Sequence, residues 1–133
     1  MPLTIGKLSK ATAVNVETIR YYERIGLLAA PSRTESGYRT FSEQDAARLC
    51  FIKRGRELGF SLDEIRTMVE LADQPEHACT DVDRLVQTHL VEVRQRIADL
   101  QRLEAELQRL AGCSESSVRE CRIIETLTGV RRP

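Results

Sequence analysis

The sequence predicts a mainly α-helical protein built from a small N-terminal head, one long helix and a short C-terminal loop segment. Three observations lead to this fold class. Two short helix patterns separated by a tight turn open the chain, a stretch of about thirty residues without proline or glycine follows the head, and three of the four cysteines flank that stretch. Hydrophobic residues make up 41% and charged residues 30% of the chain, which is typical of a folded domain and not of a disordered one.

The first two helix patterns form a helix pair. One helix is expected to begin after Thr4, and a second to run from Val16 to Arg24 with Asn15 as its N-cap and Gly26 beyond its end. Two short helices joined by a tight turn can form a helix-turn-helix, whose second helix enters the major groove of DNA. A plain helical hairpin fits the same pattern. The outer face of the second helix offers Asn15, Glu17, Thr18, Arg20 and Tyr21 as candidate DNA contacts.

A pair of short strands is predicted after the second helix. Ser36 and Gly37 read as the turn, and Tyr38 is a strand former. Arg33 and Arg39 lie on either side of that turn. A small β-wing beside a helix-turn-helix would bring Arg33, Tyr38 and Arg39 to the phosphate backbone, where contacts fix orientation without reading sequence.

Two further helices complete the predicted head. Ser42 begins a third helix that ends near Gly59, and Ser61 with Glu64 forms a capping box for a fourth. We expect Cys50 to be a buried structural thiol, because free cysteine packs as a small hydrophobic residue. The apolar face of the third helix is expected to comprise Ala46, Leu49, Phe51 and Ile52.

Charge favours a nucleic-acid contact at the N-terminal end. Residues 1–59 hold ten Lys and Arg against six Asp and Glu, whereas the remaining residues hold ten against fourteen. Lys53 and Arg54, with Arg56 nearby, are candidate phosphate contacts late in the third helix, although a solvated basic face explains them almost as well.

The stretch from Asp81 to Leu110 is predicted to be one helix of about 45 Å, at about 1.5 Å per residue. Its apolar residues alternate at spacings of three and four, with one interruption at Glu104, as in a coiled-coil seam. The alternative is a single amphipathic helix packed on its own domain. Dimerisation through a parallel or antiparallel pair is the preferred interpretation. The seam residues are Val86, Leu90, Val93, Ile97, Leu100 and Leu107.

The cysteines indicate thiol or metal chemistry at the ends of this helix. Cys79 precedes it, and Cys113 and Cys121 follow it with seven residues between them. Such a loop can bring two thiolates to one ion, and soft thiolates favour thiophilic ions over Mg²⁺ or Ca²⁺. Whether His77, Glu115 or Glu120 also bind is left open; solvated surface residues are the simpler interpretation of all three.

Several motifs together resemble the MerR family of transcription regulators over essentially the whole chain. They are Thr4–Lys10 (TIGKLSK), Val16–Glu23 (VETIRYYE), Gly37–Arg39 (GYR) and Leu58–Ile65 (LGFSLDEI). The resemblance implies a winged helix-turn-helix DNA-binding head over residues 1–72, a linker at 73–80, a long antiparallel coiled-coil dimerisation helix at 81–111, and a metal-binding loop with a C-terminal helix at 112–133. It also implies a homodimer that distorts an over-long promoter spacer when its effector binds, so that RNA polymerase can engage both promoter elements.

Within that family, the cysteines resemble those of the divalent-metal branch. The resemblance implies that Cys113 and Cys121 bind the ion together with Cys79 from the partner subunit, and that Zn, Cd, Pb or Hg is the effector of heavy-metal resistance or efflux genes. Sensors of monovalent ions typically carry serine in place of Cys79. The spacing of seven residues is one shorter than is usual for mercury sensors.

Two other functions stay open on the sequence: a thiol-redox sensor, and a metal-stapled structural or buffering dimer. An enzyme is not expected, because no acid–base pair, activated nucleophile or phosphate loop is evident. No apolar run approaches the ~18 residues of a membrane span and no signal peptide pattern is present, so the expected location is the cytoplasm.

Overall fold

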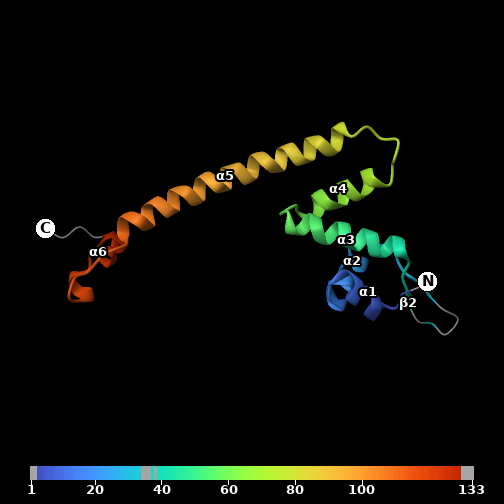
Figure 1. Ribbon diagram of the computed structural model, residues 1–133, viewed down its shortest axis with the longest axis horizontal. Coiled ribbons are helices and arrows are strands. Elements are labelled where there is room, and N and C mark those ends of the chain that lie inside the picture. The colour runs from blue at the N-terminus through green and yellow to red at the C-terminus, as the bar shows by residue number, and fades with distance from the viewer. Residues whose placement is uncertain (1–2, 34–36, 38, 130–133) are drawn as a thin grey trace. The chain divides into compact units, whose positions relative to one another are not determined.

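The computed structural model describes residues 3–33, 37 and 39–129, and its architecture is mainly helical as predicted (Figure 1). Tyr38 and the last four residues of the predicted C-terminal segment lie outside the described residues. The elements, in order, are α1 (Ile5–Thr12), α2 (Val16–Arg24), β1 (Ser32–Arg33), β2 (Arg39–Thr40), α3 (Glu43–Glu57), α4 (Leu62–Ala72), α5 (Thr80–Leu110), the 3₁₀ turn η1 (Val118–Glu120) and α6 (Arg122–Thr128).

Packing divides the chain into two compact units, Met1–Leu85 and Val86–Pro133. The first turns of α5 belong to the N-terminal unit, because Leu85 packs against the hydrophobic core of the head. The second unit contains the rest of α5 and the cysteine-bearing loop with α6.

Helix starts in the head are set by the caps that the sequence predicts. The Thr4 hydroxyl and the Asn15 amide oxygen each accept a hydrogen bond from the backbone N–H three residues further on. Ser42 and Ser61 each form a capping box with the acidic residue three positions later. Each such cap stabilises its helix by about 1 kcal/mol.

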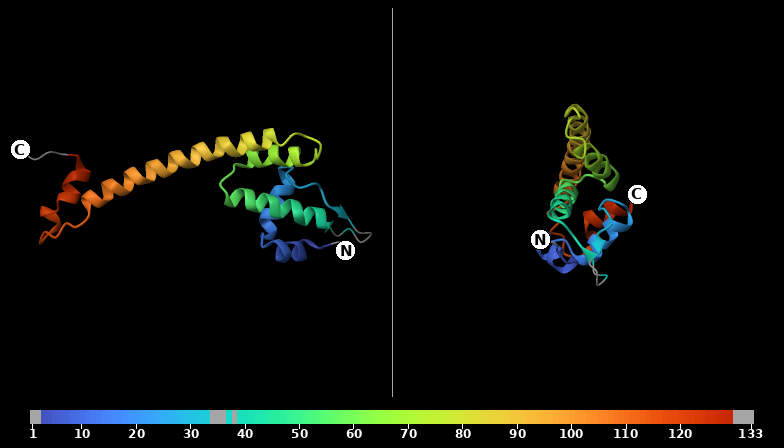
Figure 2. Two further views of the ribbon diagram at one scale, coloured as in Figure 1. Left: turned by 45° about the horizontal axis from the view of Figure 1, so that its top comes forward. Right: turned by 90° about the vertical axis from the view of Figure 1, so that its right-hand side faces the viewer.

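The core of the head is one cluster of apolar side chains contributed by α1 to α4 and the segments between them. Helix α3 packs against both α1 and α4, and these helices lie close together in Figure 2. The largest fully buried side chains are Leu8, Ile19, Leu28, Phe41, Leu49, Ile52 and Ile65.

Two expectations for α3 were wrong. Cys50 is exposed, and so is Phe51, at 40% of its surface. The buried stripe of this helix consists of Leu49, Ile52 and Gly55, spaced three residues apart. Successive helical residues are about 100° apart, so the two residues between Leu49 and Ile52 point away from the core.

The predicted wing is present as two short antiparallel strands. Ser32 pairs with Thr40, and Arg33 pairs with Arg39. Leu3 extends this ribbon through a bridge to Phe41, with both backbone N–H···O contacts at 2.7 Å. Because Phe41 is only 1% exposed, it anchors the wing in the core of the head.

Close packing between α3 and α4 depends on a buried glycine, which gives a stability prediction. A Cβ at Gly55 would lie 3.1 Å from two side-chain carbons of Ile65, which is fully buried. We expect Gly55→Ala to destabilise the head by about 1–3 kcal/mol, because overpacking forces neighbouring side chains to shift. Urea unfolding measures the change. A matched control is Gly6→Ala in α1, where an added Cβ meets nothing within 4 Å; equal stability of both variants would contradict the expectation.

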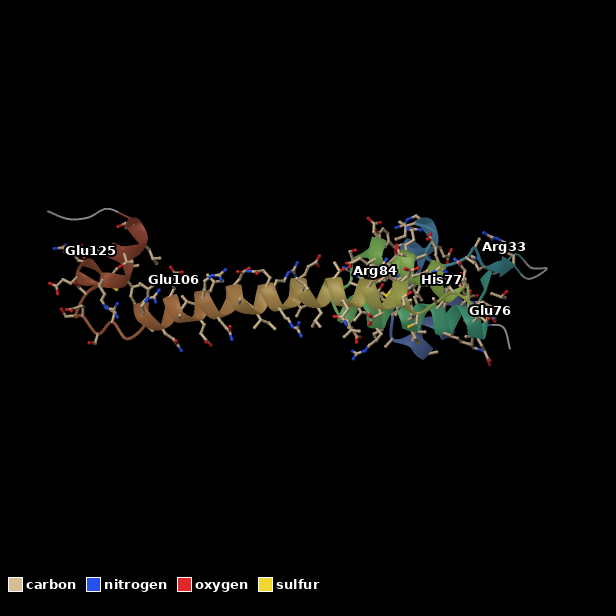
Figure 3. The ribbon with its side chains drawn as sticks, turned by 90° about the horizontal axis from the view of Figure 1, so that it is seen from above. Arg33, Glu76, His77, Arg84, Glu106 and Glu125 are labelled. Carbon is tan, nitrogen blue, oxygen red and sulfur yellow. The ribbon has the colours of Figure 1, made fainter. Side chains whose placement is uncertain are left out.

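Helix α5 carries its apolar stripe on an uncovered surface. None of its 31 residues is buried, and charged and apolar side chains alike project from it (Figure 3). Ile97, Leu100 and Leu107 are each at least half exposed. No helix in the described part of the chain has the length and apolar character needed to cross a membrane.

Candidate DNA-binding face and metal centre

The turn between α1 and α2 is short and tightly held. Ala13 ends α1 in the left-handed conformation at a φ of 59°, Val14 is buried, and Asn15 caps α2. The buried Thr12 hydroxyl donates to the Leu8 carbonyl at 2.8 Å. These contacts fix the direction in which α2 leaves the turn, which is what a helix-turn-helix requires of its second helix.

The outer face of α2 follows from which residues it buries. Ile19 and Tyr22 face the core, which leaves Glu17, Arg20 and Tyr21 exposed. Arg20 donates to the Glu17 carboxylate at 3.0 Å, an exposed pair that is readily exchanged for contacts to a phosphate or a base. Two other predicted contacts are less accessible to DNA. The side-chain oxygen of Asn15 accepts the capping hydrogen bond from the Thr18 N–H, and the Thr18 side chain is half-buried.

Arg24 shares this face and was missed by the sequence reasoning. Its guanidinium lies 5.8 Å from the ring centroid of Tyr21. The sequence could have indicated this contact, because Arg24 follows Arg20 by four residues and therefore lies on the same side of the helix. A hollow of about 310 Å³ opens beside Ile5, Arg20, Glu23 and Arg24.

Three of the remaining basic candidates have partners within the head. In the wing, Arg33 donates to the Gly37 carbonyl at 2.9 Å. On α3, the Lys53 ammonium lies 3.4 Å from the Thr12 carbonyl at the end of α1, and Arg54 pairs with Glu57 at 3.0 Å. The Arg39 backbone lies in β2, and its side chain is outside the described part.

Two of the three predicted metal ligands come together in the second unit. Gly112, with a φ of 89°, turns the chain away from the end of α5, and η1 brings it back so that Cys121 approaches Cys113. Both thiols are half-buried, and both are free of disulfide bonds. Arg122 then begins α6 and was not singled out from the sequence.

The surroundings of Cys113 favour its thiolate. The backbone N–H of Glu115 has the largest effect in lowering the pKa of the Cys113 thiol, followed by the hydrogen bond with the Cys121 side chain; the N–H groups of Arg122 and Ile123 act in the same direction. Thiolates are the metal-binding form of cysteine, so a lowered pKa reduces competition from protons.

The third predicted ligand, Cys79, belongs to the other compact unit. It is exposed immediately before the first residue of α5, and its carbonyl accepts the backbone N–H of Asp83 at 2.9 Å. His77 lies 2.6 Å from the Asp81 carboxylate through its Nε2, and this contact is the largest cause of the lowered pKa of Asp81. Glu115 and Glu120 are exposed.

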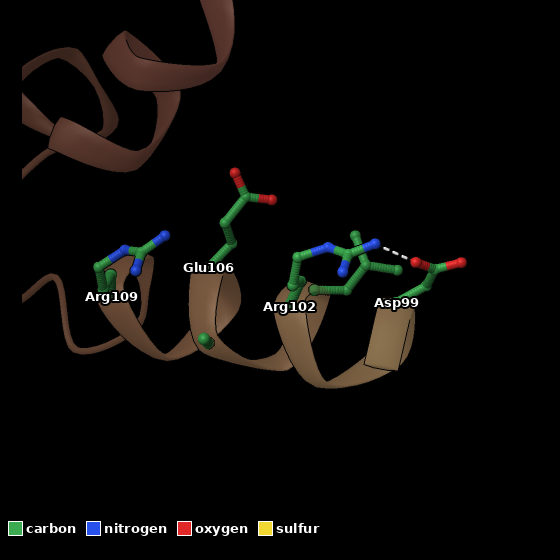
Figure 4. A pocket seen from close by; sticks show the side chains of 6 residues that line it. Asp99, Arg102, Glu106 and Arg109 are labelled. Atoms are coloured by element: carbon green, nitrogen blue, oxygen red, sulfur yellow. Dashed lines mark hydrogen bonds and ion pairs between the residues drawn. The ribbon is translucent and has the colours of Figure 1, made fainter. Parts of the chain in front are cut away.

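Within the described residues of one chain, no three His, Cys, Asp or Glu side chains gather as a metal site. A surface hollow of about 620 Å³ lies along the last turns of α5 and contains no cysteine (Figure 4). Arg102 and Asp99 form an ion pair at its edge, and the hollow is lined by Asp99, Arg102, Leu103, Ala105, Glu106 and Arg109. The donor chemistry of the loop itself, two adjacent thiols, suits a soft ion.

Comparison with known families covers most of the chain. Residues 3–71 match the model of MerR HTH family regulatory proteins, and residues 46–110 match a model described as MerR, DNA binding. The chain is 45% identical to the mercuric resistance operon regulatory protein of Bacillus cereus, over 96% of this chain and 98% of that protein. It is 44% identical to the HTH-type transcriptional regulator ZntR of Escherichia coli strain K12, over 92% and 90% of the two chains.

A solved structure of a transcription regulator is also similar to this chain. The transcription regulator PbrR691 from Ralstonia metallidurans CH34, in complex with lead(II), aligns with a TM-score of 0.83 at 40% identity, over 94% of this chain and 98% of that one. The family, the fold of head and long helix, and the expected absence of enzyme activity are thereby confirmed, since these proteins are transcription regulators. The chain belongs to the MerR family of helix-turn-helix transcription regulators, in the branch that responds to heavy metals.

Proposed function

We propose that this regulator binds promoter DNA as a homodimer and activates heavy-metal resistance or efflux genes when a divalent thiophilic ion (Zn, Cd, Pb or Hg) binds to Cys113, Cys121 and Cys79 of the partner subunit. Activation distorts the promoter so that RNA polymerase can engage it. The observation that carries this proposal is the approach of Cys113 and Cys121 in one loop, with hydrogen bonds that favour the thiolate. The relative named for mercuric resistance and the solved structure in complex with lead(II) support the class of ion without choosing among its members.

The exposed stripe on α5 supports the homodimer. A helix of 31 residues with no buried side chain leaves apolar residues in water unless another surface covers them. The stripe has the spacing of a coiled-coil seam, and a second copy of α5 is the natural complement of such a seam. Antiparallel pairing brings the start of one α5 beside the end of the other, where it can complete the two-thiol loop.

The DNA-binding part of the proposal places α2 in the major groove and the wing on the phosphate backbone. The proposed DNA contacts are those predicted from the sequence together with Arg24. Arg24 belongs to the set because it shares the exposed face of α2 with Arg20 and Tyr21. The proposed set is Asn15, Glu17, Thr18, Arg20, Tyr21, Arg24, Arg33, Tyr38, Arg39, Lys53 and Arg54.

Transcription from the cognate promoter, measured with the reduced protein and RNA polymerase, tests the function. We expect at least one of Zn²⁺, Cd²⁺, Pb²⁺ and Hg²⁺ to raise transcript yield while a strong non-chelating reductant is present. A response only to oxidant, lost under reductant, would replace metal sensing with thiol-redox sensing. If the protein binds metal but no two-fold symmetric DNA, the regulator is excluded and a metal-stapled structural dimer is the remaining function.

Loss of one positively charged contact to DNA should change the salt dependence of binding. We expect Arg20→Ala to weaken promoter binding and to reduce the slope of log affinity against log salt by about one. Binding at several salt concentrations, followed by fluorescence anisotropy of labelled promoter, measures both quantities.

Arg102→Ala is the matched control for that variant. Arg102 also pairs with a carboxylate three residues earlier on an exposed helix surface, but it lies on α5. We expect it to leave both affinity and slope unchanged. Equal affinities and slopes for Arg20→Ala and the unmodified protein would remove Arg20 from the DNA contacts.

A further inference from the structure

Arg122 ties the loop that carries the two thiols back to the end of α5. Its Nη1 donates to the Arg109 carbonyl at 2.8 Å, and its Nη2 donates to the Ala111 carbonyl at 3.0 Å. The last carbonyls of a helix have no partner within the helix, and they carry the negative end of its dipole. The guanidinium therefore satisfies exposed acceptors at a place where positive charge is favourable.

The same residue also lies beside both thiols. Arg122 directly follows Cys121 in the chain, and its backbone N–H is among the groups that donate to the sulfur of Cys113. One residue thus contacts one thiol, adjoins the other and holds the helix end that leads into Gly112. These contacts span 11 and 13 residues of sequence and close the whole loop.

A forked donor suits this arrangement. A guanidinium presents several N–H groups in a fixed plane and can bind two separate carbonyls at once, whereas a lysine ammonium is a single point of charge on a flexible stem. The contacts also connect the loop mechanically to α5, because the acceptors are the backbone of the last turn of that helix and of the residue after it.

We propose that Arg122 is a positioning residue, which holds Cys113 and Cys121 in a preformed pair and links their geometry to the end of α5. The part that concerns the metal rests on the proposed function; the part that concerns the loop holds for the metal-free protein. Residues that orient metal ligands typically contribute about 10–100-fold in metal affinity, and we expect Arg122 to act in this range.

The test compares three full-length variants. Arg122→Met keeps an unbranched, flexible stem and removes the guanidinium donors, and Arg122→Lys keeps the charge with a single ammonium. Arg119→Met is the matched control, since Arg119 lies in the same loop, within η1, and is exposed. All are studied as the reduced protein.

Two measurements are made. In the metal-free protein, amide hydrogen exchange over residues 111–121 should be about tenfold faster in Arg122→Met than in Arg119→Met, because the loop opens more readily. Cadmium affinity, followed by the thiolate-to-cadmium absorption band in competition with a chelator, should fall by about 10–100-fold. In both measurements, the value for Arg122→Lys should lie between those for Arg122→Met and Arg119→Met.

The outcomes separate this inference from the proposed function. If Arg122→Met matches Arg119→Met in exchange, or binds cadmium as tightly as the unmodified protein does, Arg122 does not position the thiols. If the unmodified protein itself shows no cadmium–thiolate band, the proposed metal site is wrong, and the metal part of this inference is wrong with it.

Discussion

Serine in place of Cys113 or Cys121 is expected to abolish the transcriptional response to metal while promoter affinity stays within about threefold of the unmodified protein, which is about 0.65 kcal/mol. A hydroxyl is a poor ligand for a thiophilic ion, so the loop loses one of its two soft donors. The candidate DNA contacts belong to the N-terminal unit, whereas both thiols belong to the other unit. Transcription with increasing metal, together with promoter binding without metal, measures the two effects separately.

Cys50→Ser is the matched control for these variants. Cys50 is an exposed free thiol on α3. Its replacement removes a more accessible sulfur without touching the loop, and we expect a normal metal response. A Cys113→Ser or Cys121→Ser protein that no longer dimerises or binds DNA would mean that the loop is a structural site and not a sensor.

The elements that the sequence predicted well depend on local interactions. Asn15 and Ser61 cap their helices through groups three residues away, so the signal is contained in one turn of chain. The wing was predictable because Ser36-Gly37 reads as a turn directly before the strand formers Tyr38 and Phe41. The long helix was predictable because no residue from Asp81 to Leu110 breaks it; the structure begins it one residue earlier, at Thr80.

Errors arose where tertiary packing decides which side of a helix is buried. Helix α3 has hydrophobic residues on several sides, and its sequence alone does not show that Leu49 and Ile52, rather than Cys50 and Phe51, meet the core. That choice depends on where α1 and α4 lie against α3.

The candidate site was predictable in its ligand types but not in its supporting contacts. Thiols at Cys113 and Cys121 stand out by residue type and spacing. The bonds of Arg122 to Arg109 and Ala111 follow only from the folded loop. Lys53 looks like a free basic residue in sequence, yet its ammonium lies against the end of α1 across 41 residues of chain.

A heterodimer with one variant in each subunit should regenerate a single metal site from two chains that are each inactive. One subunit carries Cys79→Ser, and the other carries Cys113→Ser with Cys121→Ser. Helix α5 has 31 residues, about 46 Å at the usual rise, and it separates Cys79 from Cys113 along the chain. An antiparallel partner instead supplies its own Cys79 at the end of the first chain's α5. The heterodimer then contains one complete set of three thiols and one set with none.

The heterodimer is isolated with two different affinity tags, and cadmium binding to it is compared with binding to each parent homodimer. We expect tight binding of about one ion per heterodimer, because the intact Cys79 lies on the chain whose loop is disabled and faces the intact loop of its partner. Neither homodimer can assemble three thiols. If all ligands came from one chain, every site in the heterodimer would lack at least one thiol, and no tight site would form. A verified heterodimer without that site therefore contradicts ligand sharing between subunits, and one with it places Cys79 across the dimer interface.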